Sequence, residues 1–182
     1  MDRPTEKRVA QEVHAQLRSR RLTSLPLPEL RYVPDLSDRA IRESVQAFVQ
    51  RVAATFPPNA IASHQLRFRY GVELFERRFF WEAHEMWEPL WQASPPRSPR
   101  RHLLHGLLLL TAALLRWEAG RTAAASRLAS RALEELAVAK KRRSQLGGLT
   151  ASRAYSALQH LFCRIGDSGQ IAREAMRIPR LL

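Results

Sequence analysis

A long apolar segment with helix signals at both ends constrains the fold of this chain most. Ser98 before Pro99 is the pattern of an N-cap followed by a first helical residue, and Gly120 is the residue type that commonly ends a helix. Residues 103–115 between them are almost entirely apolar, with His105 as an interruption. The apolar run is shorter than the roughly 20 residues that span a bilayer. We therefore expect a buried helix and no membrane insertion.

Apolar residues recur at helical spacing elsewhere in the chain, and turn residues separate the segments. Strand-like alternation is nearly absent, and the 182 residues include seven glycines. This pattern predicts an all-α fold, a compact antiparallel bundle of about five to six helices with an N-terminal extension. The expected helices span about 37–55, 63–77, 80–91, 99–119, 122–143 and 150–165.

The length suits one domain with flanking segments. Residues 1–36 are expected to form a basic, proline-containing extension, in which a loose helix over 1–21 precedes an extended linker. Residues 37–166 should form the helical bundle domain, and residues 167–182 a C-terminal tail or short helix.

Composition excludes several other classes of protein. A hydrophobic share of 45% and a charged share of 26% indicate a folded core rather than disorder. Cys163 is the single cysteine, so an internal disulfide and a multi-thiolate zinc site are excluded, and we expect it to be a small core residue. The charged N-terminal sequence lacks the apolar stretch of a secretory signal. We expect a cytoplasmic protein.

The net charge of +13 is concentrated near the C-terminus, where residues 97–182 carry sixteen Lys and Arg against five Asp and Glu. Such an excess can simply solvate helical faces. It can also bind a nucleic acid or another anionic partner weakly, through phosphate contacts. The residues that could share one positive face are Arg121, Arg127, Arg131, Lys140, Lys141, Arg142, Arg143 and Arg153.

The segment 80–91 holds the strongest candidate site. His84 and Glu88 are four residues apart, so both project from one face of a helix, at the spacing by which one helix offers two metal ligands. The carboxylate favours harder ions such as manganese or iron over zinc, although all three remain candidates. Glu85 occupies the position of the general base in the His-Glu-x-x-His motif of zinc proteases. If the site is hydrolytic, Glu85 would be the base.

Neighbouring residues could complete this site. His105 on the next helix could approach His84 and Glu88 as a third ligand if the two helices form an antiparallel hairpin. A metal or a small polar ligand would then lie in a pocket walled by tryptophans. The expected wall and surrounding residues are Trp81, Glu82, Glu85, Trp87, Trp91 and Arg116.

A structural explanation of the same residues is equally open. Arg116 could neutralise Glu88, His84 could bond within the core, and the tryptophans could serve packing alone. The protein would then be a helical interaction module, and a homo-oligomer is also left open. The sequence contains no glycine-rich phosphate loop, nucleophile elbow or RNA-binding signature. It therefore assigns no enzyme class.

Residues 68–136 resemble the domain of unknown function 309 family, whose motif of His, three residues, Glu, two residues and Trp is met by His84, Glu88 and Trp91. The resemblance implies an antiparallel helical bundle and a suggested role of this motif in metal binding. This chain departs from the family at His105, where Gln is usual. It departs again at Arg116, because family members often carry a His near the end of that helix.

Overall fold

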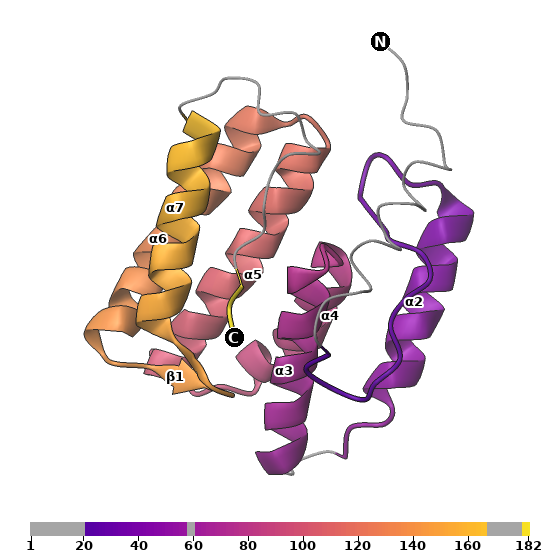
Figure 1. The fold of residues 1–182 in the computed structure, drawn as a ribbon, viewed down its shortest axis with the longest axis horizontal. Coiled ribbons are helices and arrows are strands. Elements are labelled where there is room, and N and C mark those ends of the chain that lie inside the picture. The colour runs from indigo at the N-terminus through magenta and orange to yellow at the C-terminus, as the bar shows by residue number, and fades with distance from the viewer. Residues whose placement is uncertain (1–20, 58–60, 167–179) are drawn as a thin grey trace.

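The computed structural model describes residues 21–57, 61–166 and 180–182, and in the last helix it describes side chains as far as Leu161 (Figure 1). The expected loose helix near the N-terminus and most of the expected C-terminal tail lie outside the described residues. The environment of the Cys163 side chain lies outside them as well.

The described residues form six α-helices and one small β-hairpin, which confirms the all-α prediction. None of the described helices is both long enough and apolar enough to cross a membrane. The helices are α2 (Arg39–Ala53), α3 (Ile61–Glu76), α4 (Phe80–Gln92), α5 (Pro99–Glu118), α6 (Thr122–Lys141) and α7 (Ala151–Gly166), and the strands are β1 (Gln145–Leu146) and β2 (Leu149–Thr150).

Capping residues set the ends of these helices. The Ser98 side chain caps α5 as expected, and Gly120 ends that helix in a left-handed conformation with φ of 76°. Helix α2, expected from about residue 37, begins at Arg39. Asp38 accepts the capping hydrogen bond, whereas Ser37 Oγ accepts a bond from the amide of Val33.

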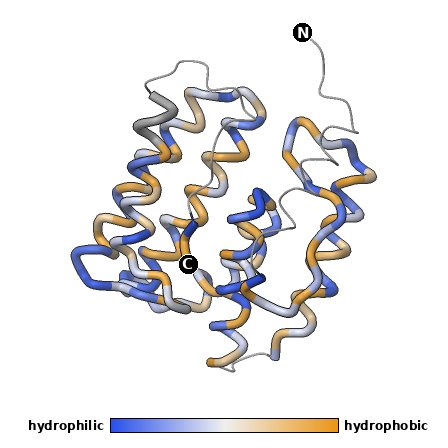
Figure 2. Tube along the Cα trace, in the orientation of Figure 1, coloured by the Kyte–Doolittle hydropathy of each residue, from blue (hydrophilic) through white to orange (hydrophobic). Residues whose placement is uncertain are grey.

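The core lies where α3, α4 and α5 meet, and hydrophobic and hydrophilic residues interleave along each of these helices (Figure 2). Trp87 is fully buried against α3, where a Cβ atom on Gly71 would lie 2.2 Å from the indole nitrogen. That nitrogen donates a hydrogen bond of 3.1 Å to the carbonyl of Phe68. A glycine is therefore required opposite this tryptophan.

Helix α6 packs closely along α5 through its small residues. Ala129 and Ala132 are completely buried, and a Cβ atom on Gly106 would lie 2.6 Å from Leu136 Cγ. The two helices run antiparallel because only the short turn at 119–121 joins them. The chain then turns through Gly147 and Gly148 in the β-hairpin, which sequence periodicity did not predict because each strand has two residues.

The segment 21–36, expected as an extended linker, lies across the helices. Val33 is 5% exposed, and Leu22, Leu25 and Leu27 pack against the core. At the other end of the chain, the backbone amides of Leu181 and Leu182 donate to the Glu76 carboxylate. Both segments are thus fastened to the bundle by side chains of the helices.

Candidate functional site

Helix α4 places the candidate residues along one half-exposed stripe. The helix packs between α3 and α5, which bury the side that carries Phe80, Ala83, Met86, Trp87 and Leu90. The opposite side is half-exposed. It carries Trp81, His84, Glu85, Glu88 and Trp91.

The His84 imidazole is fixed by a hydrogen bond to α5. Its Nδ1 atom lies 3.0 Å from the Thr111 hydroxyl oxygen, and that hydroxyl donates its single hydrogen to the Leu108 carbonyl, at 2.7 Å. With the hydroxyl hydrogen on the Leu108 carbonyl, the hydroxyl oxygen accepts from the ring, and this hydrogen-bond arrangement assigns the ring proton to Nδ1. The Nε2 atom is left with its lone pair as an acceptor or metal ligand.

Burial and charge both act on the ionisation of this stripe. Burial lowers the pKa of His84, and the nearby Glu88 carboxylate opposes that shift without cancelling it. Burial raises the pKa of Glu85, and the negative charge of Glu88 raises it further. A neutral imidazole thus lies beside two carboxyl groups that repel each other.

His105 does not join His84 and Glu88. Its ring stacks on Trp91 with centroids 5.4 Å apart, and its Nδ1 atom lies 3.0 Å from one oxygen of Glu135 on α6. The other oxygen of Glu135 lies 2.6 Å from Nδ1 of His102. His105 is six residues from Thr111, a separation of about 9 Å along the helix axis. The structure therefore does not place it as the expected third ligand.

The three tryptophans of α4 occupy different environments. The Trp81 ring contacts the Tyr32 ring edge to face, with centroids 5.4 Å apart. The Trp91 ring, which stacks on His105, also contacts the Arg101 guanidinium, 4.5 Å from the ring centroid. Trp87, one of the residues expected around the site, lies completely buried in the core. Both partly exposed rings flank the His84–Glu88 pair along the helix.

Arg116 forms an ion pair with Asp35 instead of the expected one with Glu88. The distance from Arg116 Nη1 to Asp35 Oδ2 is 3.1 Å, and Arg121 contacts the same oxygen at 2.9 Å. A cavity of about 90 Å³ lies next to this group and is lined by Pro34, Ala112, Leu115 and Arg116. It adjoins Asp35 and the N-terminal segment, and neither His84 nor Glu88 lines it.

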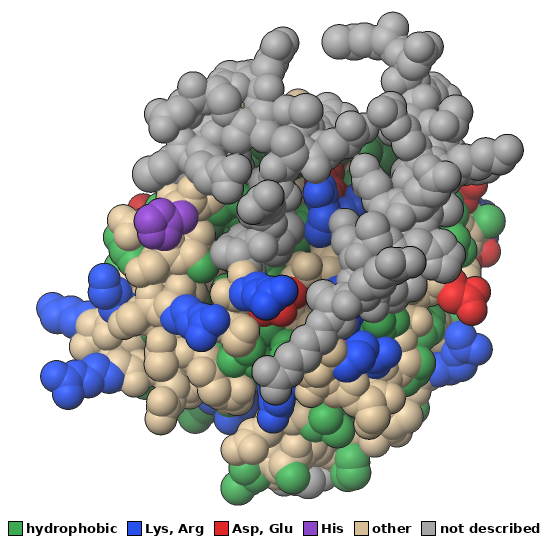
Figure 3. Space-filling view, in the orientation of Figure 1, with side chains coloured by type: hydrophobic (Ala, Val, Ile, Leu, Met, Phe, Trp, Pro, Cys, Tyr) green, Lys and Arg blue, Asp and Glu red, His purple; other side chains and the backbone are tan. Residues whose placement is uncertain are grey.

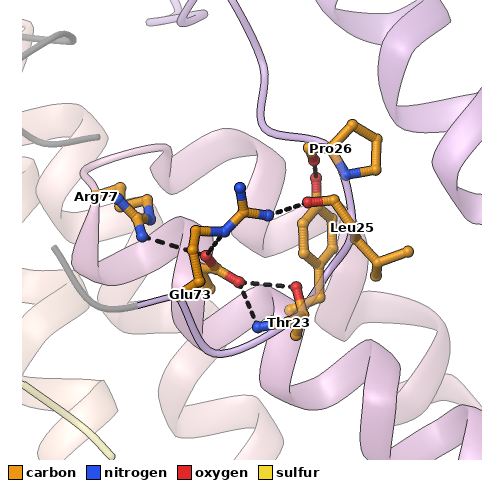
Figure 4. Close-up of polar contacts among 7 residues, drawn as sticks. Thr23, Leu25, Pro26, Glu73 and Arg77 are labelled. Carbon is orange, nitrogen blue, oxygen red and sulfur yellow. Dashed lines mark hydrogen bonds and ion pairs between the residues drawn. The ribbon is translucent and has the colours of Figure 1, made fainter. Parts of the chain in front are cut away.

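Sequence reasoning missed a buried polar cluster on α3. One oxygen of Glu73 accepts from the amide and the hydroxyl of Thr23, at 2.9 and 2.7 Å (Figure 4). The other oxygen pairs with Arg21 and with Arg77, which is 1% exposed. Nearby, the Tyr70 hydroxyl donates to the carbonyl of Pro26. Glu73 lies between the apolar residues Val72 and Leu74, and this position in the sequence could have indicated a buried carboxylate.

A second buried cluster joins α5 to the N-terminal segment. Glu118 Oε1 lies 3.0 Å from both Arg31 and Arg78. Glu82, expected near the candidate site, is instead completely buried, and one of its oxygens accepts from the Tyr32 amide. Burial raises the pKa of Glu82 to about 8, although hydrogen bonds and the Arg31 charge oppose the shift. These clusters hold the segment 21–36 in place.

Within the described part of the chain, no group of three or more His, Cys, Asp or Glu residues is arranged to hold a metal ion. The α4 stripe offers His84 and Glu88, with Glu85 beside them. The buried carboxylates that the sequence did not indicate, Glu73 and Glu118, form hydrogen bonds and ion pairs within the fold.

Residues 68–128 match the family model described as Domain of unknown function (DUF309). This match confirms the resemblance indicated by the His-Glu-Trp motif and covers most of the expected stretch. No curated protein and no solved structure matches the chain.

Proposed function

We propose that α4 carries an open binding site for a divalent metal ion, centred on the Nε2 atom of His84 and the carboxylate of Glu88. Water would complete the coordination shell. Manganese, iron and zinc are the candidate ions, and the carboxylate favours the first two over zinc.

The protonation state of His84 carries this proposal. A metal-binding histidine typically donates its other ring N–H to a carbonyl, a carboxylate or water, which fixes the ring and its tautomer. Thr111 serves that role here because its hydroxyl is itself committed to the Leu108 carbonyl. The lowered pKa of His84 also keeps its ring neutral, as a metal ligand must be.

The neighbouring carboxyl groups favour a cation. The charge of Glu88 raises the cost of ionising Glu85, and a bound cation would relieve that repulsion. If the bound ion activates water, Glu85 is the candidate base because its raised pKa makes it a better proton acceptor than an ordinary glutamate. Two protein ligands leave most of the coordination shell to water, so we expect weak affinity.

The test is calorimetric titration of protein purified without chelator, with manganese, ferrous iron and zinc in separate experiments. The wild type should bind one ion, and His84→Ala and Glu88→Gln should both lose that binding. Glu135→Gln is the matched control, because it alters the other His–carboxylate group without touching α4.

Thr111→Val gives the sharper measurement, since it keeps the His84 ring and removes the group that orients it. Loss of such a supporting contact typically weakens metal affinity by about 10–100-fold. A wild type that binds no ion, or a His84→Ala variant that binds normally, would reject the metal site. A large fall in melting temperature of His84→Ala, together with no binding by the wild type, would instead support a purely structural role.

A further inference from the structure

A second feature of the molecule is a cluster of exposed cations at the end of the bundle where α6 finishes. We call it the basic end, and its members are Arg97, Lys140, Lys141, Arg142, Arg143 and Arg153. No Asp or Glu occurs in the sequence from 136 to 166, nor from 93 to 103. In Figure 3, Lys and Arg side chains project from the lower left of the molecule without acidic side chains beside them.

Tertiary contacts bring these cations together from three segments. Arg142 Nη1 donates a hydrogen bond of 2.9 Å to the carbonyl of Arg97, which joins the end of α6 to the loop before α5. The Lys140 ammonium lies 4.6 Å from the centroid of the Tyr155 ring, which joins α6 to α7. Arg121, which the sequence grouped with these residues, lies at the opposite end of α6 and pairs with Asp35.

The cations of the basic end have no carboxylate partner among the described residues. Their contacts there are a backbone carbonyl for Arg142 and an aromatic face for Lys140. The negative end of the α6 dipole explains some attraction for cations. It does not explain Arg97 and Arg153, which belong to other segments.

The backbone of Arg143 adds an independent observation. It occupies the left-handed region with φ of 52°, at the same position after α6 that Gly120 occupies after α5. The following amide, of Ser144, bonds back to the carbonyl of Ala139, in the pattern of a helix-ending turn. Glycine adopts this conformation without the steric cost that a side chain adds. Arginine at this position is thus less stable locally than glycine would be.

We infer that the basic end binds the phosphate backbone of double-stranded nucleic acid without reading its sequence. Clustered arginines suit phosphate groups because the guanidinium donates two parallel hydrogen bonds to oxygen pairs. Phosphate contacts of this kind require no base-reading motif. The site is separate from the α4 stripe.

The other side chains of the molecule favour a duplex over alternative anions. The aromatic ring found at the basic end, that of Tyr155, is half-buried and lies beneath the Lys140 ammonium, so it offers unpaired bases little stacking surface. In the last two turns of α6, Val138 is the one large hydrophobic residue that the described structure exposes. A membrane-binding surface presents several large apolar side chains.

Fluorescence polarisation with a short mixed-sequence duplex, as RNA and as DNA, tests the inference. Six phosphate contacts predict that affinity falls by about a thousand-fold between about 50 mM and about 200 mM salt. The double variant Arg142→Ala/Arg143→Gly should reduce the slope of log affinity against log salt by about two units. The matched control, Arg127→Ala/Arg131→Ala, removes the same charge from exposed positions in the middle of α6 and should keep a steeper slope.

The single variant Arg143→Gly separates binding from folding. Its melting temperature should rise, because the backbone strain is relieved, while its affinity for the duplex falls. Four outcomes would overturn the inference. The first is that the wild type does not bind either duplex at the lower salt concentration, and the second is that the matched control loses as much affinity as the double variant. The third is that Arg143→Gly binds more weakly but also has a lower melting temperature, so that the lost affinity reflects unfolding. The fourth is that the protein binds phosphatidylserine-containing vesicles but neither duplex.

Discussion

Two buried carboxylates, Glu73 on α3 and Glu118 on α5, each pair with arginines, whereas at the basic end none of the described residues supplies a carboxylate. Glu73 and Glu118 each contact two arginines, and three of those four arginines are largely removed from water. Arg142 and Arg143 remain exposed. The same residue type thus fastens the chain in one region and presents free positive charge in the other.

The physical difference between the two regions is the cost of desolvation. A buried charge is tolerated only when a partner and hydrogen bonds replace its lost water, so every partner in such a cluster matters to the fold. An exposed charge keeps its water and contributes little to stability in either direction. Mutations should therefore act on stability near α3 and on binding at the basic end.

Glu73→Ala should have the largest effect on stability. The substitution removes the acceptor of two Thr23 hydrogen bonds and an ion-pair partner of the buried Arg77. Breaking a buried ion pair typically costs about 3–5 kcal/mol. Urea denaturation of the purified protein would measure the change in the free energy of unfolding.

Arg142→Ala is the comparison for that experiment and should change stability by no more than about 0.5 kcal/mol. Glu73→Gln should be intermediate, because the amide oxygen can still accept from Thr23. If Glu73→Ala and Arg142→Ala destabilise the protein equally, the contrast between the two regions is wrong.

Glu82 should make stability depend on pH. Its folded-state pKa of about 8 is above the ordinary value, so the folded protein holds a proton that the unfolded chain releases. The resulting contribution is complete below about pH 4.5 and is lost as pH rises toward about 8. The slope cannot exceed about 1.4 kcal/mol per pH unit.

Glu82→Gln should remove this dependence, so the variant gains stability relative to wild type as pH rises through that window. Unfolding curves of both proteins from acidic to mildly alkaline pH would measure the difference. Subtracting the two cancels the opposite contribution of His84, whose lowered pKa adds stability as pH rises toward its ordinary value. A constant difference across the window would show that Glu82 is ionised throughout.

Asp35→Asn should have the smallest effect of the three. Asp35 contacts Arg116 and Arg121, but all three side chains are roughly half-exposed, and such pairs contribute about 0.2–1 kcal/mol each. Asn also tolerates the left-handed backbone found at Asp35, with φ of 69°. The destabilisation should shrink as salt is added, and melting curves at two ionic strengths would show whether it does.

Much of the fold was predictable because helix formation depends on local sequence. The Ser98 cap and the Gly120 stop set α5 within a residue of the expected bounds. Local sequence did not decide which of two nearby polar residues caps a helix, or which apolar residue of a helix faces the core. Asp38 caps α2 while the neighbouring Ser37 bonds to Val33, and the apolar Leu66 of α3 is 42% exposed.

The candidate site divides in the same way. The helical repeat placed His84 and Glu88 on one face, which requires no knowledge of the neighbouring helices. The helical repeat could not show how far along α5 the partner of His84 would lie. The axial offsets between the packed helices place Thr111 beside His84 and Glu135 beside His105. Helix faces follow from sequence periodicity, whereas the axial offset between helices depends on how their side chains interlock.

The sequence by itself determined the helical class, the approximate helix boundaries, the family motif and the excess of basic residues near the C-terminus. The tertiary structure alone decided which charges are neutralised: Glu73 and Glu118 by arginines both near to and distant from them in sequence, and the basic end by no described carboxylate. Periodicity is a property of neighbours along the chain. The environment of a charge depends on residues that folding brings beside it, and Arg31 and Glu118, for example, are separated by 87 positions.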